Sequence, residues 1–202
     1  MSTLGKIRLP AAERRQAIVE AAMTVFSTGS YSGATTADIA REAGVSEPIL
    51  YRHFGSKREL YFACLDEAWR RLRQVFDEKV ALHEQGGPLP TPREMALRLR
   101  ETAHVLPPNL WIQALTEAGE DPEIARYLRR HMRDVHDFMA DGIRRSQAAG
   151  GIAADRDPDA EAWIFLAGIL LLSVADRLGG LLDDDDFAAI AAQRLRWLTG
   201  SD

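Results

Sequence analysis

The chain has 202 residues, 46% hydrophobic and 27% charged, a length that suits one large domain or a small and a medium one. Its formal net charge of −5 argues against a protein covered in nucleic acid. The charge is uneven, however: residues 1–60 hold 8 Lys and Arg against 6 Asp and Glu, whereas residues 61–202 hold 17 against 24. A mildly basic N-terminal end on an acidic body is typical of a protein that binds DNA locally.

The single cysteine, Cys64, cannot form an internal disulfide and indicates a reducing compartment. Residues 1–16 contain no apolar core of a signal peptide. The longest apolar stretch, residues 162–175, is interrupted by Ser173 and is shorter than the roughly 18 residues expected of a membrane-spanning helix. We therefore expect a cytoplasmic protein with no membrane partner.

Almost every segment is predicted to be helical, because Pro and Gly fall between periodic stretches and no convincing alternating strand pattern occurs. The first helix is predicted over about residues 11–28, where apolar side chains recur at steps of three and four. Thr35 or Thr36 caps a short second helix, and Ser46 caps the next short one. Gly44 lies in the tight turn between them, so these two helices form a helix-turn-helix.

The helix-turn-helix is expected to be packed against the first helix through apolar side chains, namely Ile18, Val25, Phe26, Ile39, Ala40, Leu50 and Phe54. The outward side of its second helix then carries Glu47, Pro48, Ile49, Tyr51, Arg52 and His53. A helix of this size fits the major groove, and its N-terminal part meets base edges in this motif. Hydroxyl, imidazole and ammonium groups at Thr36, Tyr51, His53 and Lys57 suit phosphate oxygens. The alternative is a packing unit in which Tyr51 covers the core.

A third, long helix is predicted from Lys57 to about Lys79, capped by Ser56, and a loop follows at residues 85–92. The remaining helices are predicted at about residues 92–105, 108–119, 122–148, 158–178 and 185–199. Four aspartates, Asp183 to Asp186, are expected to precede and start the last helix, whose dipole favours negative charge there.

Residues 35–61, TTADIAREAGVSEPILYRHFGSKRELY, closely resemble the N-terminal signature of the TetR family of transcriptional regulators. The preceding RRQAIVEAAMTVFSTGSYSGATT resembles the first helix of that family and its connection, so the resemblance covers about residues 12–68. It implies a homodimeric repressor that binds a palindromic operator in double-stranded DNA and is released by a small-molecule effector. By position, the DNA contacts fall on Thr36, Ser46, Glu47, Pro48, Tyr51, His53 and Lys57, and the outward Arg52 is included with them.

The expected organisation is all-α, with a three-helix DNA-binding domain over residues 1–58 and a ligand-binding and dimerisation domain over residues 59–202. Residues 159–178 form a helix that is apolar nearly all round and therefore needs burial on every side. This helix and the last helix, contributed by each of two chains, would form a four-helix bundle around a twofold axis. The predicted dimer interface comprises Trp163, Leu166, Leu170, Val174, Phe187, Ile190 and Leu195. A buried central helix of a monomer is the alternative.

A ligand pocket in the larger domain is expected from its aromatic, thioether and imidazole side chains, which suit an apolar or aromatic effector. The candidate ligand-binding residues are Trp69, Met95, His104, Trp111, Leu115, Met132, His136, Met139 and Trp163. For each of them an ordinary core position is the alternative.

The sequence contains no pattern of an enzyme. No phosphate-binding glycine loop or nucleophile elbow occurs, and Cys64 belongs to an apolar stripe. His131 and His136 are five residues apart and so point to different helix faces, which makes them a poor metal pair. We expect no enzymatic activity, no cofactor and no metal. A DNA-binding regulator without an effector, and a helical interaction module, remain alternative functions.

Overall fold

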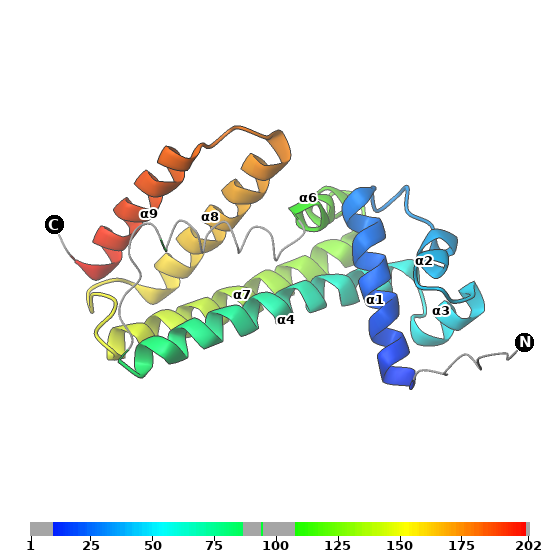
Figure 1. The fold of residues 1–202 in the computed structure, drawn as a ribbon, viewed down its shortest axis with the longest axis horizontal. Coiled ribbons are helices and arrows are strands. Elements are labelled where there is room, and N and C mark those ends of the chain that lie inside the picture. The colour runs from blue at the N-terminus through cyan, green and yellow to red at the C-terminus, as the bar shows by residue number, and fades with distance from the viewer. Residues whose placement is uncertain (1–9, 87–93, 95–107, 201–202) are drawn as a thin grey trace, which may run out of the picture. The chain divides into compact units, whose positions relative to one another are not determined.

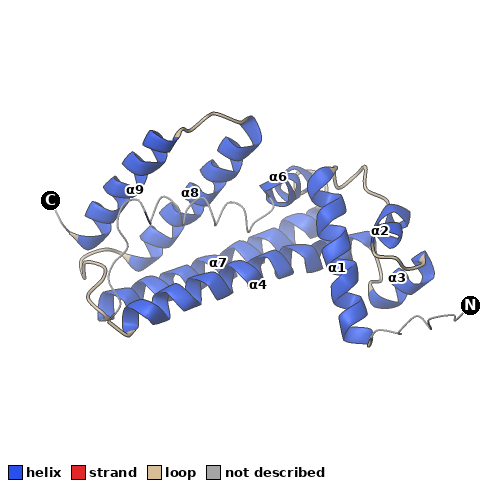
Figure 2. Cartoon of the chain, viewed as in Figure 1, coloured by secondary structure: helices blue, strands red, loops and turns tan. Residues whose placement is uncertain are grey.

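The structure, a computed structural model, describes residues 10–86, 94 and 108–200. Figures 1 and 2 show that the elements among these residues are helices, with no strand among them. The expected all-α class is therefore confirmed for the described part of the chain. The helix predicted at about residues 92–105 lies largely outside the described residues.

The chain divides into two compact units, residues 1–67 (unit 1) and 68–202 (unit 2). Unit 1 contains α1 (Ala11–Thr28), α2 (Thr36–Glu42), α3 (Glu47–His53) and the first turns of α4 (Lys57–Glu84). Unit 2 contains the rest of α4, α6 (Pro108–Glu117), α7 (Pro122–Ala148), α8 (Pro158–Leu178) and α9 (Asp184–Thr199). The division falls within α4, later than the expected boundary after residue 58.

The core of unit 1 explains why α4 begins there. Phe26 of α1 contacts the ring of Tyr61 edge-on, with 4.9 Å between the ring centroids, and both side chains are fully buried. The other core positions expected for this unit are also buried, namely Ile18, Ile39, Ala40, Leu50 and Phe54, whereas Val25 is only half-buried. The apolar face of the first turns of α4 thus belongs to the same core as α1.

The helix starts in unit 1 differ in how they are capped. The hydroxyl of Thr35 accepts a 3.1 Å hydrogen bond from the backbone N–H of Asp38, so Thr35 caps α2. Ser46 occupies the expected N-cap position of α3, but its side chain forms no capping hydrogen bond. Ser56 caps α4 by accepting from the N–H of Glu59, at 3.1 Å. The expectation of a capping bond from Ser46 is therefore wrong.

Cys64 occupies a core position in unit 1, as its apolar stripe indicates. Its side chain is fully buried, and burial is the main reason that the pKa of its thiol is raised, with further contributions from Glu20 and Glu67. A thiol held in its neutral form is a poor nucleophile and a poor metal ligand.

Unit 2 is built on long helices whose apolar faces meet. Its core cluster combines Val135, Met139 and Ala140 of α7 with Ala162 and Leu166 of α8. Asp121 caps α7 and Asp157 caps α8, each by accepting two backbone N–H groups. Both helices begin at the predicted residue, which is a proline in each case. Asp183 caps α9 in a reciprocal capping box with Asp186, which confirms the role expected for the acidic run.

Helix α8 has the predicted bounds, but its apolar window is longer than the stretch of residues 162–175 that the sequence interpretation considered. An 18-residue window, Pro158–Ala175, has a mean hydropathy of 1.5 and meets the length and composition of a membrane-spanning helix. The argument that this stretch is too short is therefore wrong. Its packing against α6 and α7 gives an alternative explanation, because the core helix of a water-soluble bundle passes the same test.

Candidate DNA-binding surface and ligand pocket

The surface of α3 is divided between core and solvent as the sequence predicts. Leu50 and Phe54 are buried, whereas Tyr51 is 50% exposed and Pro48 and Arg52 are also exposed. Because Pro48 and Arg52 are four residues apart and lie opposite Leu50 on the helix, they form its outermost ridge. A ridge of this kind is what a helix presents to the major groove.

Three of the predicted DNA contacts are connected by hydrogen bonds. The hydroxyl of Thr36 donates to Oε1 of Glu47 at 2.8 Å, and the Thr36 oxygen lies 3.2 Å from the phenolic oxygen of Tyr51. A threonine hydroxyl has one proton, so when that proton is directed to Glu47 the Tyr51 hydroxyl must be the donor to Thr36. The start of α2 and the start of α3 are thereby held together by side chains that the sequence assigns to DNA.

Lys57 has an internal role that the sequence interpretation did not include. Its Nζ donates to the carbonyl oxygens of Tyr31 at 2.7 Å and Ala34 at 3.0 Å, and lies 4.5 Å from the centroid of the Tyr31 ring. These bonds connect the start of α4 to the segment between α1 and α2. The proposed phosphate contact of Lys57 would have to compete with them.

The remaining predicted contacts lie on the same elements. Ser46 and Arg52 are exposed, and His53 is half-buried at the last turn of α3. The described contacts include no hydrogen bond or ion pair of the Arg52 guanidinium. This residue is therefore the cation of α3 that is best placed to bind a partner.

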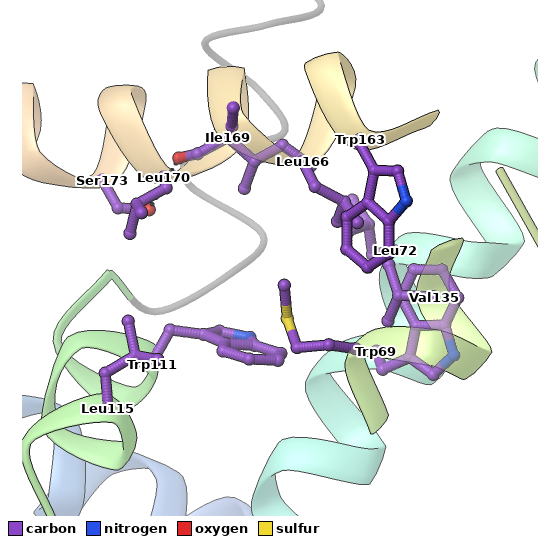
Figure 3. Close-up of a pocket in the computed structure, with 12 residues that line it drawn as sticks. Trp69, Leu72, Trp111, Leu115, Val135, Trp163, Leu166, Ile169, Leu170 and Ser173 are labelled. Carbon is purple, nitrogen blue, oxygen red and sulfur yellow. Dashed lines mark hydrogen bonds between the residues drawn. The ribbon is translucent and has the colours of Figure 1, made fainter. Parts of the chain in front are cut away.

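Unit 2 contains a cavity of about 290 Å³ between α4, α6, α7 and α8 (Figure 3). Its lining is aromatic and aliphatic, comprising Trp69, Leu72, Trp111, Leu115, Met132, Val135, Trp163, Leu166, Ala167, Ile169, Leu170 and Ser173. Figure 3 shows Trp111 and Leu115 of α6 on one side of the space and Trp163 and Leu166 of α8 on another. None of these described lining residues is charged, which fits a ligand that is apolar over most of its surface.

Polar groups at the cavity are few among the described residues. The hydroxyl of Ser173 donates to the carbonyl oxygen of Ile169 at 3.0 Å, within its own helix. The indole Nε1 of Trp111 is buried and has no hydrogen-bond partner within the described part of the chain. Trp111 also contacts the buried ring of His131, with 5.1 Å between the centroids.

The structure brings together five of the predicted ligand-binding residues, Trp69, Trp111, Leu115, Met132 and Trp163. Met139 packs in the core cluster instead. His136 is buried and stacks on Trp163, with its ring nitrogens 2.9 Å from Oδ1 of Asp137 and 3.1 Å from the carbonyl oxygen of Asp159. Met95 and His104 lie outside the described residues.

Apart from Trp163, the sequence interpretation missed the contribution of α8 to the cavity. It assigned Leu166 and Leu170 to a dimer interface and did not single out Ala167, Ile169 or Ser173 for the cavity. The apolar character of α8 all round its axis was the available signal. A helix of this kind needs a partner on each side, and the cavity accounts for one side.

The other side of α8, together with α9, exposes apolar side chains in the single chain. On α8, Ile164 is 47% exposed and Leu171 is 45% exposed, and Ile190 of α9 is 38% exposed. Trp163 and Leu170, which were predicted for the interface, line the cavity and are also 48% and 44% exposed. Val174, Phe187 and Leu195 are half-buried, and Leu166 is buried. Exposed apolar residues gathered on neighbouring helices are typical of a protein–protein interface.

Comparison with known proteins agrees with the helix-turn-helix geometry. The family described as bacterial regulatory proteins, tetR family, matches residues 18–64. The HTH-type transcriptional regulator BetI of Rhizobium meliloti is 31% identical over 137 residues, which cover 65% of this chain and 64% of BetI. The N-terminal part of the chain, residues 18–64, is therefore similar to the regulators of the TetR family.

Other relatives match over different lengths. The HTH-type transcriptional activator FasR of Mycolicibacterium smegmatis is 52% identical over 58 residues, which cover 29% of this chain and 26% of FasR. The chain therefore spans less than two thirds of these relatives in the aligned stretches. A TetR-family regulator from Mesorhizobium loti has the same fold, with a TM-score of 0.72 at 17% identity over 94% of this chain and 98% of its own. A regulator from Saccharomonospora viridis in complex with choline has a TM-score of 0.61 at 26% identity, and the match covers 92% of this chain and 94% of that regulator.

Proposed function

We propose that this chain is a transcriptional regulator of the TetR family that acts as a cytoplasmic homodimer, binds a palindromic operator and represses transcription until a small effector occupies the cavity of unit 2. The observation that carries the proposal is the cavity itself. A space of about 290 Å³ lined by three tryptophans is more than close packing of a core needs, since voids larger than a water molecule are few in protein interiors.

The lining of the cavity supports two ligand classes. A flat aromatic compound would stack on the indole rings of Trp69, Trp111 and Trp163. An alkylammonium group would be attracted to the faces of the same rings by cation–π interaction. The choline complex of the Saccharomonospora viridis protein is a precedent for a small quaternary ammonium ligand in a protein of this fold.

Helix α4 provides a physical route from effector to DNA. It carries Trp69 and Leu72 of the cavity lining, and its first turns carry Leu60 and Tyr61 of the core of unit 1. A ligand that binds one tilt of this helix better than another would shift the population of DNA-competent dimers. The size of that shift is limited by the difference in affinity for the two states.

Intrinsic fluorescence gives a direct test, because three of the chain's 4 tryptophans line the cavity. Aromatic and alkylammonium compounds that change this fluorescence would be added to the complex of the protein with its selected DNA. We expect a compound that binds the cavity to release the DNA. If a compound binds and the DNA is retained at every concentration, the regulator works without that effector.

A matched pair of variants locates the effect. Ala167→Phe places a ring in the cavity and should abolish the response to ligand while DNA binding is retained. Ala160→Phe adds the same ring at an exposed position of the same helix that does not line the cavity, and should leave the response unchanged. An equal response in both variants would place the effector elsewhere. Absence of salt-sensitive DNA binding in the parent chain would instead favour a helical interaction module.

A further inference from the structure

Glu47 is an acidic residue on the helix that is proposed to enter the major groove. Its side chain is half-buried at the first turn of α3, and its Oε1 accepts the Thr36 hydroxyl at 2.8 Å. The described contacts give Glu47 no ion pair with a cation. A carboxylate that is not neutralised opposes DNA phosphates, so its presence on this surface lowers non-specific affinity.

The carboxylate of Glu47 is held in place by its neighbours. Thr36 donates to Oε1, and Tyr51 is left to donate to Thr36, which makes a chain of hydrogen bonds that ends at the carboxylate. An ordered side chain loses less conformational entropy when it binds a partner. The second oxygen, Oε2, keeps its capacity to accept hydrogen bonds.

A carboxylate can distinguish the bases in the major groove because it only accepts. Cytosine presents the N4 amino donor there, whereas guanine presents the acceptors N7 and O6 and thymine presents O4 and a methyl group. Adenine presents a donor beside the acceptor N7, which would repel a carboxylate. Cytosine is therefore the base whose edge fits Glu47.

We propose that Glu47 is a specificity-determining residue that selects a cytosine in each half-site of the operator, with cytosine N4 donating to the carboxylate. Thr36 and Tyr51 are positioning residues that orient this carboxylate. The inference rests on the proposed function, because it assumes that α3 reads operator DNA. It assigns to an acidic residue a role in sequence choice and none in affinity for the DNA backbone.

The competing explanation is that Glu47 only connects α2 to α3 through Thr36. The substitution Glu47→Gln separates the two roles. The amide oxygen of glutamine can still accept from Thr36, so the connection is kept. Its amide group makes two hydrogen bonds to adenine, at N6 and N7, but only one to cytosine, so the preferred base should change to adenine. A purely structural residue would leave the base preference unchanged.

The experiment is selection of bound duplexes from a random DNA pool, carried out in parallel for the full chain, Glu47→Gln and Glu47→Ala. We expect the parent to enrich a palindrome with cytosine at one position of each half-site, by about tenfold over the other bases. Glu47→Gln should change that position to adenine, and Glu47→Ala should lose the preference there while the other positions are kept. Thr36→Val should weaken the preference for cytosine without changing it to another base.

The outcomes separate the inference from the proposed function. If the parent and Glu47→Gln enrich the same palindrome with the same base preferences, the proposed operator binding is supported and the proposed role of Glu47 is overturned. If the parent enriches no sequence, the proposed function fails together with the inference. Thermal melting of each variant shows whether it is folded, and Glu47→Ala provides a second reading of the position should the glutamine variant be unstable.

Discussion

Trp197 of α9 donates its indole N–H to Oε1 of Glu161 in α8 at 2.6 Å, and Arg194 forms an ion pair with the other carboxylate oxygen of the same residue. Glu161 is 3% exposed, and its two partners compensate the cost of burying its carboxylate. The two helices of the proposed dimer interface are thus joined within one chain by a buried carboxylate, and not only by apolar packing.

Removal of this carboxylate should be costly. Glu161→Ala leaves the donors of Arg194 and Trp197 without their acceptor, and we expect the free energy of unfolding to fall by about 2 kcal/mol. Urea denaturation followed by circular dichroism measures the change. The control is Gln193→Ala on the exposed side of α9, where the loss should stay within about 0.5 kcal/mol. Equal effects of the two substitutions would contradict this role of Glu161.

Gly151, in the connection between α7 and α8, has no room for a side chain. A Cβ at this position would overlap the imidazole ring of His83 on α4. Gly151→Ala should therefore lower the free energy of unfolding by about 1–3 kcal/mol, as overpacking does in other cores. The added substitution His83→Ala should recover part of that loss, since it removes the ring that the methyl group meets.

Gly142 in α7 is the matched control for Gly151. A Cβ there would meet only Val80 Cγ2, at an ordinary contact distance of 3.7 Å. Gly142→Ala should raise the free energy of unfolding by about 0.5–1 kcal/mol, because alanine loses less backbone entropy than glycine in a helix. Destabilisation at both positions would show that the effect at Gly151 is not the overlap with His83.

Lys57 should contribute to the stability of unit 1. Lys57→Met keeps the aliphatic stem but removes the donor to the Tyr31 and Ala34 carbonyl oxygens, and we expect a loss of about 1–3 kcal/mol in the free energy of unfolding. The salt dependence of DNA binding should not change. A fall of about one unit in the slope of log K against log salt would show that Lys57 binds a phosphate after all.

Arg52 provides the opposite pattern to Lys57. Its guanidinium is exposed and makes no described contact, so Arg52→Ala should leave stability within about 0.5 kcal/mol of the parent. The same substitution should weaken DNA binding, by up to about tenfold if the guanidinium pairs with a guanine. Calorimetry and a fluorescence anisotropy titration on the same samples separate the two effects.

The homodimer can be tested at Ile190, which is 38% exposed on α9 and does not line the cavity. Ile190→Arg places a charge in the proposed interface and should convert dimers to monomers or aggregates in sedimentation experiments. Leu82→Arg, on α4, is the control because Leu82 is 53% exposed and lies outside the predicted interface. A clean dimer for Ile190→Arg would show that the interface lies elsewhere.

The sequence predicts the helices well where local signals define both ends. Asp121 and Pro122 start α7 and Gly150 follows its end, and the helix has the predicted bounds. Helix α4 extends to Glu84, beyond the predicted end at Lys79. The reason is tertiary, because Arg145, 61 residues away, binds the Glu84 carboxylate at 2.7 and 2.8 Å and thereby lowers the pKa of that carboxyl.

The sequence predicts which side chains form the candidate sites, but only some of the contacts between them. Periodicity is enough to place Tyr51 and Arg52 on the outer side of α3 and Leu50 in the core. It cannot show that Thr36 binds Glu47, because that pair depends on how α3 packs against α2. Nor can it show that Lys57 binds Tyr31, because that pair depends on how the connection between α1 and α2 folds back. Similarly, spacing alone does not distinguish Met132 at the cavity from Met139 in the core.

Selection of bound duplexes from a random DNA pool by the purified chain, at moderate salt, tests the central claim most directly. A dimer of helix-turn-helix domains predicts an enriched palindrome whose half-sites lie about one helical turn apart, roughly 34–36 Å. Enrichment of that palindrome would establish a dimeric, sequence-specific regulator and supply the DNA for the effector experiments. Recovery of a single, asymmetric site would contradict the dimer, and no enrichment above non-specific binding would contradict sequence reading by α3.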